Sequence, residues 1–211
     1  MILKCKRNVN GESLSVHRLY PVIAYEIDNE KEVKKYKVVD DCKSLSWKGI
    51  DFFDIISDKL DSYKKLNNSK RIEYICSDLV EKDFFVNYYL ENDNSIDANK
   101  QLEESLISIL SKELTSKDLM QNLNLVGYCD ESAILLLKAF FRKSSRQDII
   151  TFAKNIYNKS EELNSYIVQI IVESLIPYRE SDIENLFIQL YMDDLLCNKE
   201  TMKMINGYLG M

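Results

Sequence analysis

The chain has 211 residues and a formal net charge of −6 at pH 7, with 45% hydrophobic and 29% charged residues. This composition is typical of a folded globular protein, and the length suits one large domain or two small ones. The five glycines and two prolines are too few for the glycine-rich turns that bind nucleotide phosphates. Because no apolar run approaches the ~20 residues of a membrane-spanning helix and Met1–Arg7 lacks a secretory pattern, we expect a cytoplasmic protein.

The cysteines predict reduced thiols. They are odd in number and show no CxxC or other metal-type spacing. Most of them fall inside apolar segments, which favours buried thiols in a reducing compartment. The five positions are Cys5, Cys42, Cys76, Cys129 and Cys197.

Short β-strands are predicted in the first 60 residues. The β-branched and aromatic runs lie between clusters of turn residues, and no helical stretch separates them. We expect strands over Ile2–Lys6, Tyr20–Ile27, Val33–Val39 and Leu45–Gly49. The segment Asp51–Leu60 predicts a helical turn or short helix. Closely spaced strands of this kind indicate a small antiparallel sheet or barrel.

This block resembles the small SH3-like barrels found at the start of various bacterial and phage proteins. The likeness covers about residues 1–56 and departs from the usual pattern at Leu19, where a turn residue is expected. It is carried by Leu3–Asn8, Leu14–Val16, Leu19–Val22, Tyr36–Asp41 and Trp47 followed by Phe52. The resemblance implies an SH3-like domain over 1–60.

The aromatic residues of this block have two interpretations. In SH3 domains, an aromatic groove binds proline-rich peptides. Tyr20, Tyr25, Tyr36 and Trp47 are the residues that would line such a groove here. Aromatic side chains in a small barrel more often form its core, and the core is the interpretation we favour.

The remainder of the chain predicts an all-helical domain. Residues 61–77 are polar and basic and predict a linker, and residues 78–211 carry helical periodicity. Asp130, Ser145, Ser160 and Ser181 are expected N-caps. We expect helices over 78–90, 95–114, 116–125, 130–142, 146–157, 161–175, 181–196 and 199–208. With the N-terminal strands, this gives an α+β fold.

A weak internal repeat runs through the helical part. The pair Asp148-Ile149 recurs as Asp182-Ile183, and a similar pair, Asp118-Leu119, occurs earlier in the chain. In the other helices, Ile134 and Leu137 match Ile167 and Ile170. Helix pairs that recur every ~30–45 residues are typical of an α-solenoid. The helical part therefore resembles HEAT or armadillo repeats, and an ordinary helix bundle is the alternative.

Common catalytic machinery is missing from the sequence. No Gly-rich phosphate loop, nucleophile elbow or HExxH motif is present. The only histidine, His17, is expected at the surface or in a turn. The adjacent acids Asp40-Asp41 and Asp193-Asp194 point in different directions, so neither pair forms an acid–base couple. We expect a protein that is not an enzyme and that binds no cofactor, metal, nucleic acid or membrane.

The acidity lies in the C-terminal two-thirds of the chain. Residues 1–70 hold 14 Lys/Arg and 11 Asp/Glu, and residues 71–211 hold 14 and 23. Polar residues share one face of the helix from Ser181, which suits a basic protein partner. The alternative is that this face is merely solvated. The predicted protein-binding residues are Glu180, Asp182, Glu184, Asn185, Gln189, Tyr191 and Asp193.

These features favour a protein-binding function. Size, acidity and the lack of catalytic groups resemble the profile of immunity proteins that neutralise polymorphic bacterial toxins, and such a partner would be a basic toxin domain. The alternative is a peptide-binding scaffold or assembly module of phage or regulatory type.

Overall fold

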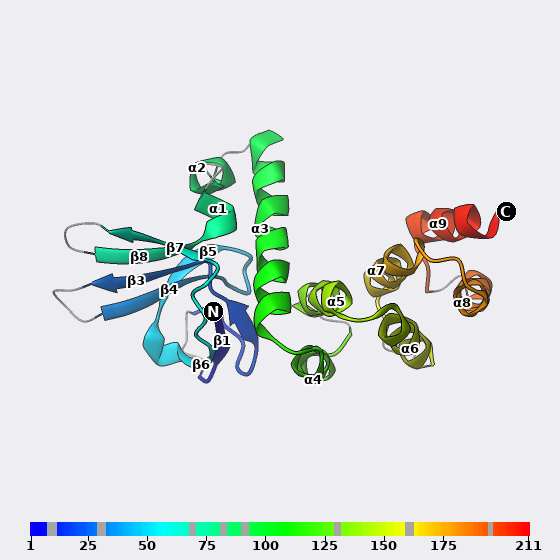
Figure 1. The fold of residues 1–211 in the computed structure, drawn as a ribbon, viewed down its shortest axis with the longest axis horizontal. Helices are drawn as coiled ribbons and strands as arrows, with labels where there is room; N and C mark the ends of the chain where they lie inside the picture. Colours follow the sequence, from blue (N-terminus) through cyan, green and yellow to red (C-terminus); the bar gives the residue numbers. More distant parts are fainter. Residues whose placement is uncertain are drawn as a thin grey trace. The chain divides into compact units, whose positions relative to one another are not determined.

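The fold combines an N-terminal β-rich part with C-terminal helices. The computed structural model describes residues 1–7, 12–28, 33–67, 71–80, 84–89, 93–128, 132–158, 163–193 and 196–211. Within these residues, every strand lies before Ser77 and every α-helix begins at or after it, so the α+β class is confirmed (Figure 1). The chain divides into two compact units, Met1–Thr115 and Ser116–Met211.

The strands of the first unit form two antiparallel sheets. The smaller sheet has the order β2-β1-β6, with β1 over Ile2–Cys5, β2 over Leu19–Pro21 and β6 over Phe53–Ser57. The larger has the order β5-β4-β3-β8-β7. Its strands are β3 (Ala24–Asp28), β4 (Val33–Val39), β5 (Leu45–Gly49), β7 (Tyr63–Asn67) and β8 (Arg71–Cys76).

Aromatic side chains form the core of this unit. Tyr25 lies opposite both Tyr36 and Tyr74 in the register of the larger sheet, with ring centroids 5.4 and 5.5 Å apart. Phe53 meets Tyr36 edge-on at 6.4 Å and Tyr20 at 5.9 Å. Because Tyr20, Tyr25 and Tyr36 are at least 91% buried, the interpretation as core residues is confirmed for these three.

Trp47 lies on the other face of the larger sheet. It pairs with Lys37 across β4 and β5, and Lys37 alternates along β4 with the buried Tyr36. The Trp47 side chain is 37% exposed. Trp47 therefore shares no groove with the buried tyrosines.

Two sequence predictions for residues 51–77 are wrong. The expected helix at Asp51–Leu60 is a short 3-10 turn, η1 (Ile50–Phe52), followed by strand β6. The expected linker over 61–77 contains β7 and β8, which extend the larger sheet. β7 is an edge strand whose Lys64 and Lys65 are exposed. Charged side chains are common on edge strands because they discourage pairing with other chains. The polar sequence of β7 was therefore mistaken for a linker.

Three helices complete the first unit. The segment predicted as one helix over 78–90 holds two, α1 (Ser77–Val80) and α2 (Phe84–Tyr88). The longer α3 (Asp93–Glu113) follows. It packs against α1 and α2 and against β1 and β2, burying Leu102, Leu106, Ile109 and Leu110.

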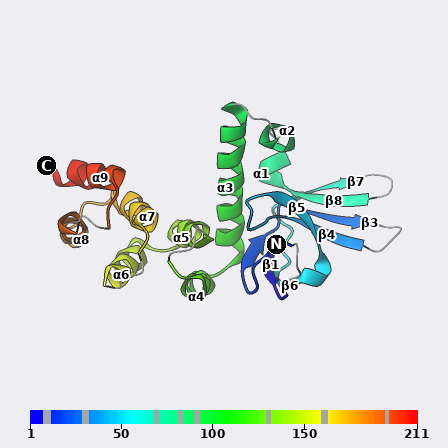
Figure 2. The ribbon, with the colours of Figure 1, turned by 180° about the vertical axis from the view of Figure 1, so that it is seen from behind.

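The second unit is built from successive helix pairs. Each of α4, α6 and α8 is followed by a helix of a second layer, and α5, α7 and α9 contact one another in turn within that layer (Figure 2). The helices are α4 (Ser116–Val126), α5 (Ser132–Lys143), α6 (Arg146–Tyr157), α7 (Ser165–Leu175), α8 (Ser181–Met192) and α9 (Lys199–Leu209).

The sequence repeat coincides with this helix pairing. Ile134 and Ile167 are each the third residue of their helices, α5 and α7. Leu119, Ile149 and Ile183 lie near the starts of α4, α6 and α8, and all three are buried. The recurring apolar positions therefore occupy equivalent places in successive helix pairs.

The predicted N-caps have different outcomes. Ser145 caps α6 through a capping box in which its hydroxyl accepts the Asp148 N–H, while the Asp148 carboxylate accepts the Ser145 N–H. Ser181 is not a cap, because it is the first residue of α8 and Glu180 precedes it without a side-chain cap bond. Asp130 and Ser160 lie outside the described residues.

Among the described helices, none has the length and apolarity needed to cross a membrane.

Candidate functional site

The predicted binding residues follow the exposed side of α8. Asp182, Glu184, Asn185 and Gln189 are exposed there. Glu180 stands at its N-cap and is half-buried, as are Tyr191 and Asp193 at its C-terminal end. The helical spacing therefore places these residues along one helix, as predicted. Whether they contact a partner stays a prediction.

Two of the acids on this face form ion pairs with α6. Arg146 Nη1 lies 2.7 Å from Glu180 Oε1, and Lys154 Nζ lies 2.9 Å from Asp182 Oδ2. All four side chains keep 30% or more of their surface exposed, so each pair contributes little to stability. These contacts reduce the net negative charge that α8 presents.

Apolar side chains on α8 were missed by the sequence analysis. Ile188 and Met192 are four residues apart and expose 48% and 79% of their surface. Residues four apart are neighbours on a helix surface. The outer side of α8 is therefore a mixture of acids, amides and exposed apolar groups, a composition that protein interfaces share.

A groove lies between α4 and α6. The space between these two helices has a volume of about 470 Å³. Its floor consists of Met120, Tyr128, Phe140, Phe152 and Ile156. The three aromatic rings of the floor contact one another at 5.2 and 6.3 Å. The volume falls within the 300–1,000 Å³ typical of ligand sites.

The rims of this groove are polar. Ser116, Lys117 and Asn124 come from α4, at positions that share one face of the helix. The rim on α6 consists of Asp148, Thr151 and Asn155. One hydrogen bond links rim and floor, because the Tyr128 hydroxyl donates to Asn124 Oδ1 at 2.9 Å. The groove therefore combines an apolar floor with amide and hydroxyl groups along both edges.

Comparison of the chain with protein families, with curated proteins and with solved structures found no match.

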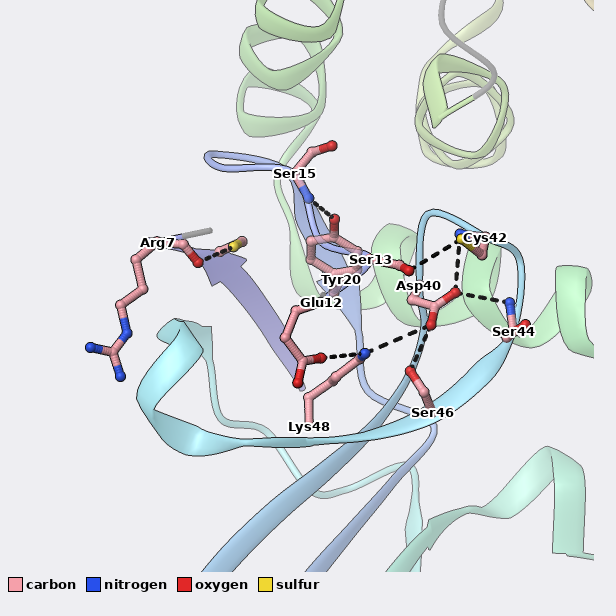
Figure 3. A network of polar contacts seen from close by, with 11 residues as sticks. Arg7, Glu12, Ser13, Ser15, Tyr20, Asp40, Cys42, Ser44, Ser46 and Lys48 are labelled. Carbon is pink, nitrogen blue, oxygen red and sulfur yellow. Dashed lines mark hydrogen bonds and ion pairs between the residues drawn. The ribbon is translucent and has the colours of Figure 1, made fainter. Parts of the chain in front are cut away.

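A second polar cluster lies in the first unit, around Asp40 (Figure 3). Lys48 Nζ donates to Glu12 Oε2 at 2.6 Å and lies 3.8 Å from Asp40 Oδ2. The Asp40 carboxylate also accepts the backbone N–H groups of Cys42 and Ser44 and the Ser46 hydroxyl. The bonds from Cys42, Ser44 and Ser46 stabilise the tight turn between β4 and β5, and the bond between Lys48 and Glu12 ties β5 to the segment that precedes β2.

The neighbouring Asp41 has different partners. Its carboxylate accepts the Ser15 hydroxyl, the Tyr20 hydroxyl and Arg18 Nη1 at 2.7 to 2.9 Å. Burial raises the pKa of the Tyr20 phenol well above its usual range, and the Asp41 carboxylate adds to the shift. Asp40 and Asp41 thus point to separate partners, as their adjacent positions predicted.

The histidine and the described cysteines lie outside the lining of the α4–α6 groove. His17 is exposed in a turn at a positive φ of 70°, as predicted. In the part of the chain that the structure describes, no three His, Cys, Asp or Glu residues are grouped to hold a metal ion. Of the cysteines, Cys5, Cys42, Cys76 and Cys197 are free thiols, and Cys129 lies outside the described residues.

The α4–α6 groove is the feature that sequence reasoning missed. A partial signal was present, because Met120 and Asn124, like Thr151 and Asn155, are spaced by four residues and share a helix face. The spacing cannot reveal that α4 and α6 stand apart, since that depends on how the first two helix pairs stack. Sequence analysis instead favoured α8, where polar residues are most concentrated.

Proposed function

We propose that this chain is a non-enzymatic protein-binding protein and that its helical unit, Ser116–Met211, binds the partner. The observation that carries the proposal is the α4–α6 groove, where an apolar floor is bordered by exposed amide and hydroxyl side chains. Protein-binding sites combine apolar anchors with a polar rim in this way. The exposed Ile188 and Met192 on α8 extend the apolar surface available to a partner.

In its most concrete form, the chain is a cytoplasmic immunity protein that neutralises a basic toxin domain. The excess of acids in residues 71–211 supports this form, because complementary charge speeds encounter with a basic partner. The successive helix pairs of α4–α9 support a HEAT-like repeat, and the antiparallel strands of residues 2–76 support an SH3-like origin of the N-terminal part.

The alternative is a peptide-binding scaffold that uses the N-terminal aromatic residues. Only Trp47 among the proposed groove residues has substantial exposure, whereas Tyr20, Tyr25 and Tyr36 are buried. Trp47 has Lys37 Nζ 5.4 Å from its ring centre, and the same amino group lies 4.5 Å from that of Phe85. These contacts give the scaffold function less support than the groove gives to the helical unit.

An immunity function predicts that an adjacent gene encodes the toxin, and the test is co-expression of this chain with that toxin. Wild-type protein should restore growth of cells that express the toxin. Thr151→Arg fills the groove from its α6 rim and should abolish the rescue. Gln147→Arg introduces the same side chain one turn earlier on α6, at an exposed position that does not line the groove, and should rescue normally.

Each outcome of this experiment has a separate meaning. Failure of wild-type protein to restore growth excludes the immunity function toward that toxin. Full rescue by Thr151→Arg excludes the groove from the interface. Circular dichroism of both variants serves as the folding control, since Thr151 and Gln147 are exposed and exposed positions usually change stability by under about 0.5 kcal/mol.

A further inference from the structure

We propose that the α4–α6 groove binds a linear segment of the partner in extended conformation. Apolar side chains of this segment occupy the floor, and its main chain hydrogen-bonds to Asn124 on one rim and to Thr151 and Asn155 on the other. This inference rests on the protein-binding function proposed above and specifies the chemistry of the partner.

The floor suits apolar side chains. Phe140, Phe152 and Ile156 are at least 95% buried, so they form a firm base. Met120 is half-buried at the α4 edge, and a flexible thioether adapts to side chains of different shape. A groove of about 470 Å³ accommodates side chains rather than the whole body of a second helix, whose diameter is ~10–12 Å.

The rim groups are available for a partner. Asn124 Oδ1 accepts the Tyr128 hydroxyl, which holds the side chain in place and leaves its amino group for another acceptor. Within the described residues, no hydrogen bond to a partner is found for the side chains of Thr151 and Asn155, and both are exposed. A primary amide offers both donor and acceptor atoms, which match the N–H and C=O groups of a peptide.

The hydrogen-bonding needs of these rims distinguish an extended segment from a helix. The main chain of a helix satisfies its own hydrogen bonds. A helix laid over the groove would bury the rim amides without main-chain partners, and each buried unsatisfied group is costly. An extended chain has free N–H and C=O groups along both edges, and alternate side chains point to the same side. One edge therefore faces α4, the other faces α6, and every second side chain meets the floor.

The charges at the groove predict that the segment is uncharged. Lys117 on the α4 rim and Asp148 on the α6 rim are both close to the starts of their helices. Lys117 is positive and Asp148 is negative, so together they favour neither a positively nor a negatively charged segment at the groove. The remaining lining side chains are neutral. A segment with alternating apolar and uncharged polar residues is the occupant that fits these groups.

The test uses a phage-displayed library of random linear peptides selected on the full-length protein. Synthetic versions of the selected peptides are then titrated against wild-type protein and variants by isothermal calorimetry. Asn124→Ala together with Asn155→Ala should weaken binding about 30-fold, which corresponds to about 2 kcal/mol at 1.4 kcal/mol per tenfold. Asn155→Ala alone keeps the bond between Tyr128 and Asn124 and should weaken binding about 5-fold.

The control and the contrary outcomes separate this inference from the protein-binding function. Asn67→Ala makes the same change at an exposed position on β7 and should leave peptide affinity unchanged. The inference is overturned if no peptide is selected, if the double variant binds as tightly as wild type, or if the selected peptides become helical on binding. If growth rescue by the wild-type protein persists after such a result, the proposed function stands and only the extended-segment inference fails.

Discussion

Burial controls the reactivity of the thiols. Burial raises the pKa of Cys5 and Cys76 above the ordinary value and that of Cys197 to about 11, so little reactive thiolate forms at neutral pH. Cys42 is exposed. In a Cys129→Ser background, we expect Ellman's reagent at about pH 8 to label Cys42 rapidly and the other three slowly.

Two results would contradict this expectation for the thiols. A second rapidly labelled thiol in the Cys129→Ser variant would show that burial does not protect the remaining cysteines. Wild-type protein that is denatured without reductant should give a titre of five thiols, one for each cysteine. A titre of three or fewer would indicate a disulfide and an oxidising compartment.

A pair of facing carboxylates makes stability depend on pH. Glu73 lies opposite Glu26 in the register of β8 and β3. Burial raises the pKa of Glu73, Glu26 raises it further, and Lys37 and Arg71 oppose the shift. Because the folded-state pKa lies above the unfolded value, the stabilising contribution is present below the unfolded pKa and is lost as pH rises through the folded pKa.

Replacement of Glu73 removes this dependence. We expect Glu73→Gln to raise the melting temperature at about pH 7, where the wild-type carboxylate is charged, and to leave it nearly unchanged at about pH 4. Thermal unfolding followed by circular dichroism at both pH values measures the difference. A destabilised variant at about pH 7 would mean that attraction to the positive charges of Lys37 and Arg71 outweighs burial and the repulsion from Glu26.

At the scale of elements, a strand could be predicted from the sequence where its apolar and polar residues alternate clearly. The strand at Val33–Val39 was predicted with its observed bounds because the buried Tyr36 and Val38 alternate with lysines. β7 was missed because an edge strand with exposed lysines lacks the apolar alternation of a covered strand. The larger sheet therefore has more strands than the sequence indicated.

Helix starts illustrate a second limit of the sequence. Ser145 and Ser181 each precede an apolar helical pattern, and each was predicted as an N-cap. Both serines are followed three residues later by an acid, Asp148 or Glu184. Only Ser145 forms a capping box, because Ser181 is itself the first residue of α8. The α4–α6 groove was not predictable in this way, since it depends on the spacing between helices that are not adjacent in sequence.

The two serines give a direct comparison of cap strength. We expect Ser145→Ala to lower the free energy of unfolding by about 1 kcal/mol, because the Asp148 N–H loses its acceptor. Ser181→Ala should change it by less than about 0.5 kcal/mol, because Ser181 lies within the first turn of α8 and is exposed. Urea denaturation of both variants measures the difference. Equal losses would mean that the two serines have the same role.

At the scale of the whole molecule, charge is distributed unevenly along the chain. Residues 71–211 hold 23 Asp/Glu against 14 Lys/Arg, whereas residues 1–70 hold 11 against 14. Exposed charges steer a partner over about a Debye length, which is ~8 Å in physiological salt. If the partner is a basic toxin domain, its association should slow as salt rises while its dissociation changes less.

The acidic side of α8 is the place to test steering. We expect Asp182→Lys, Glu184→Lys and Asp193→Lys, combined in one variant, to slow association with the toxin encoded by the adjacent gene and to leave dissociation nearly unchanged. Loss of the exposed pair between Asp182 and Lys154 costs little stability, so the variant should fold. Biosensor kinetics at low and physiological salt measure both rates, with circular dichroism as the folding control.

A matched variant separates local charge from net charge. Asp51, Asp58 and Asp61 are exposed in the first unit, and their replacement by lysine changes the net charge by the same amount. If the acids of α8 steer the partner, the α8 variant slows association more than this control does, since steering depends on charges near the docking surface. Equal slowing in both variants would assign the effect to net charge. An unchanged association rate in the α8 variant would show that the acids of α8 do not steer the partner, and the exposed Trp47 would then be the next residue to test.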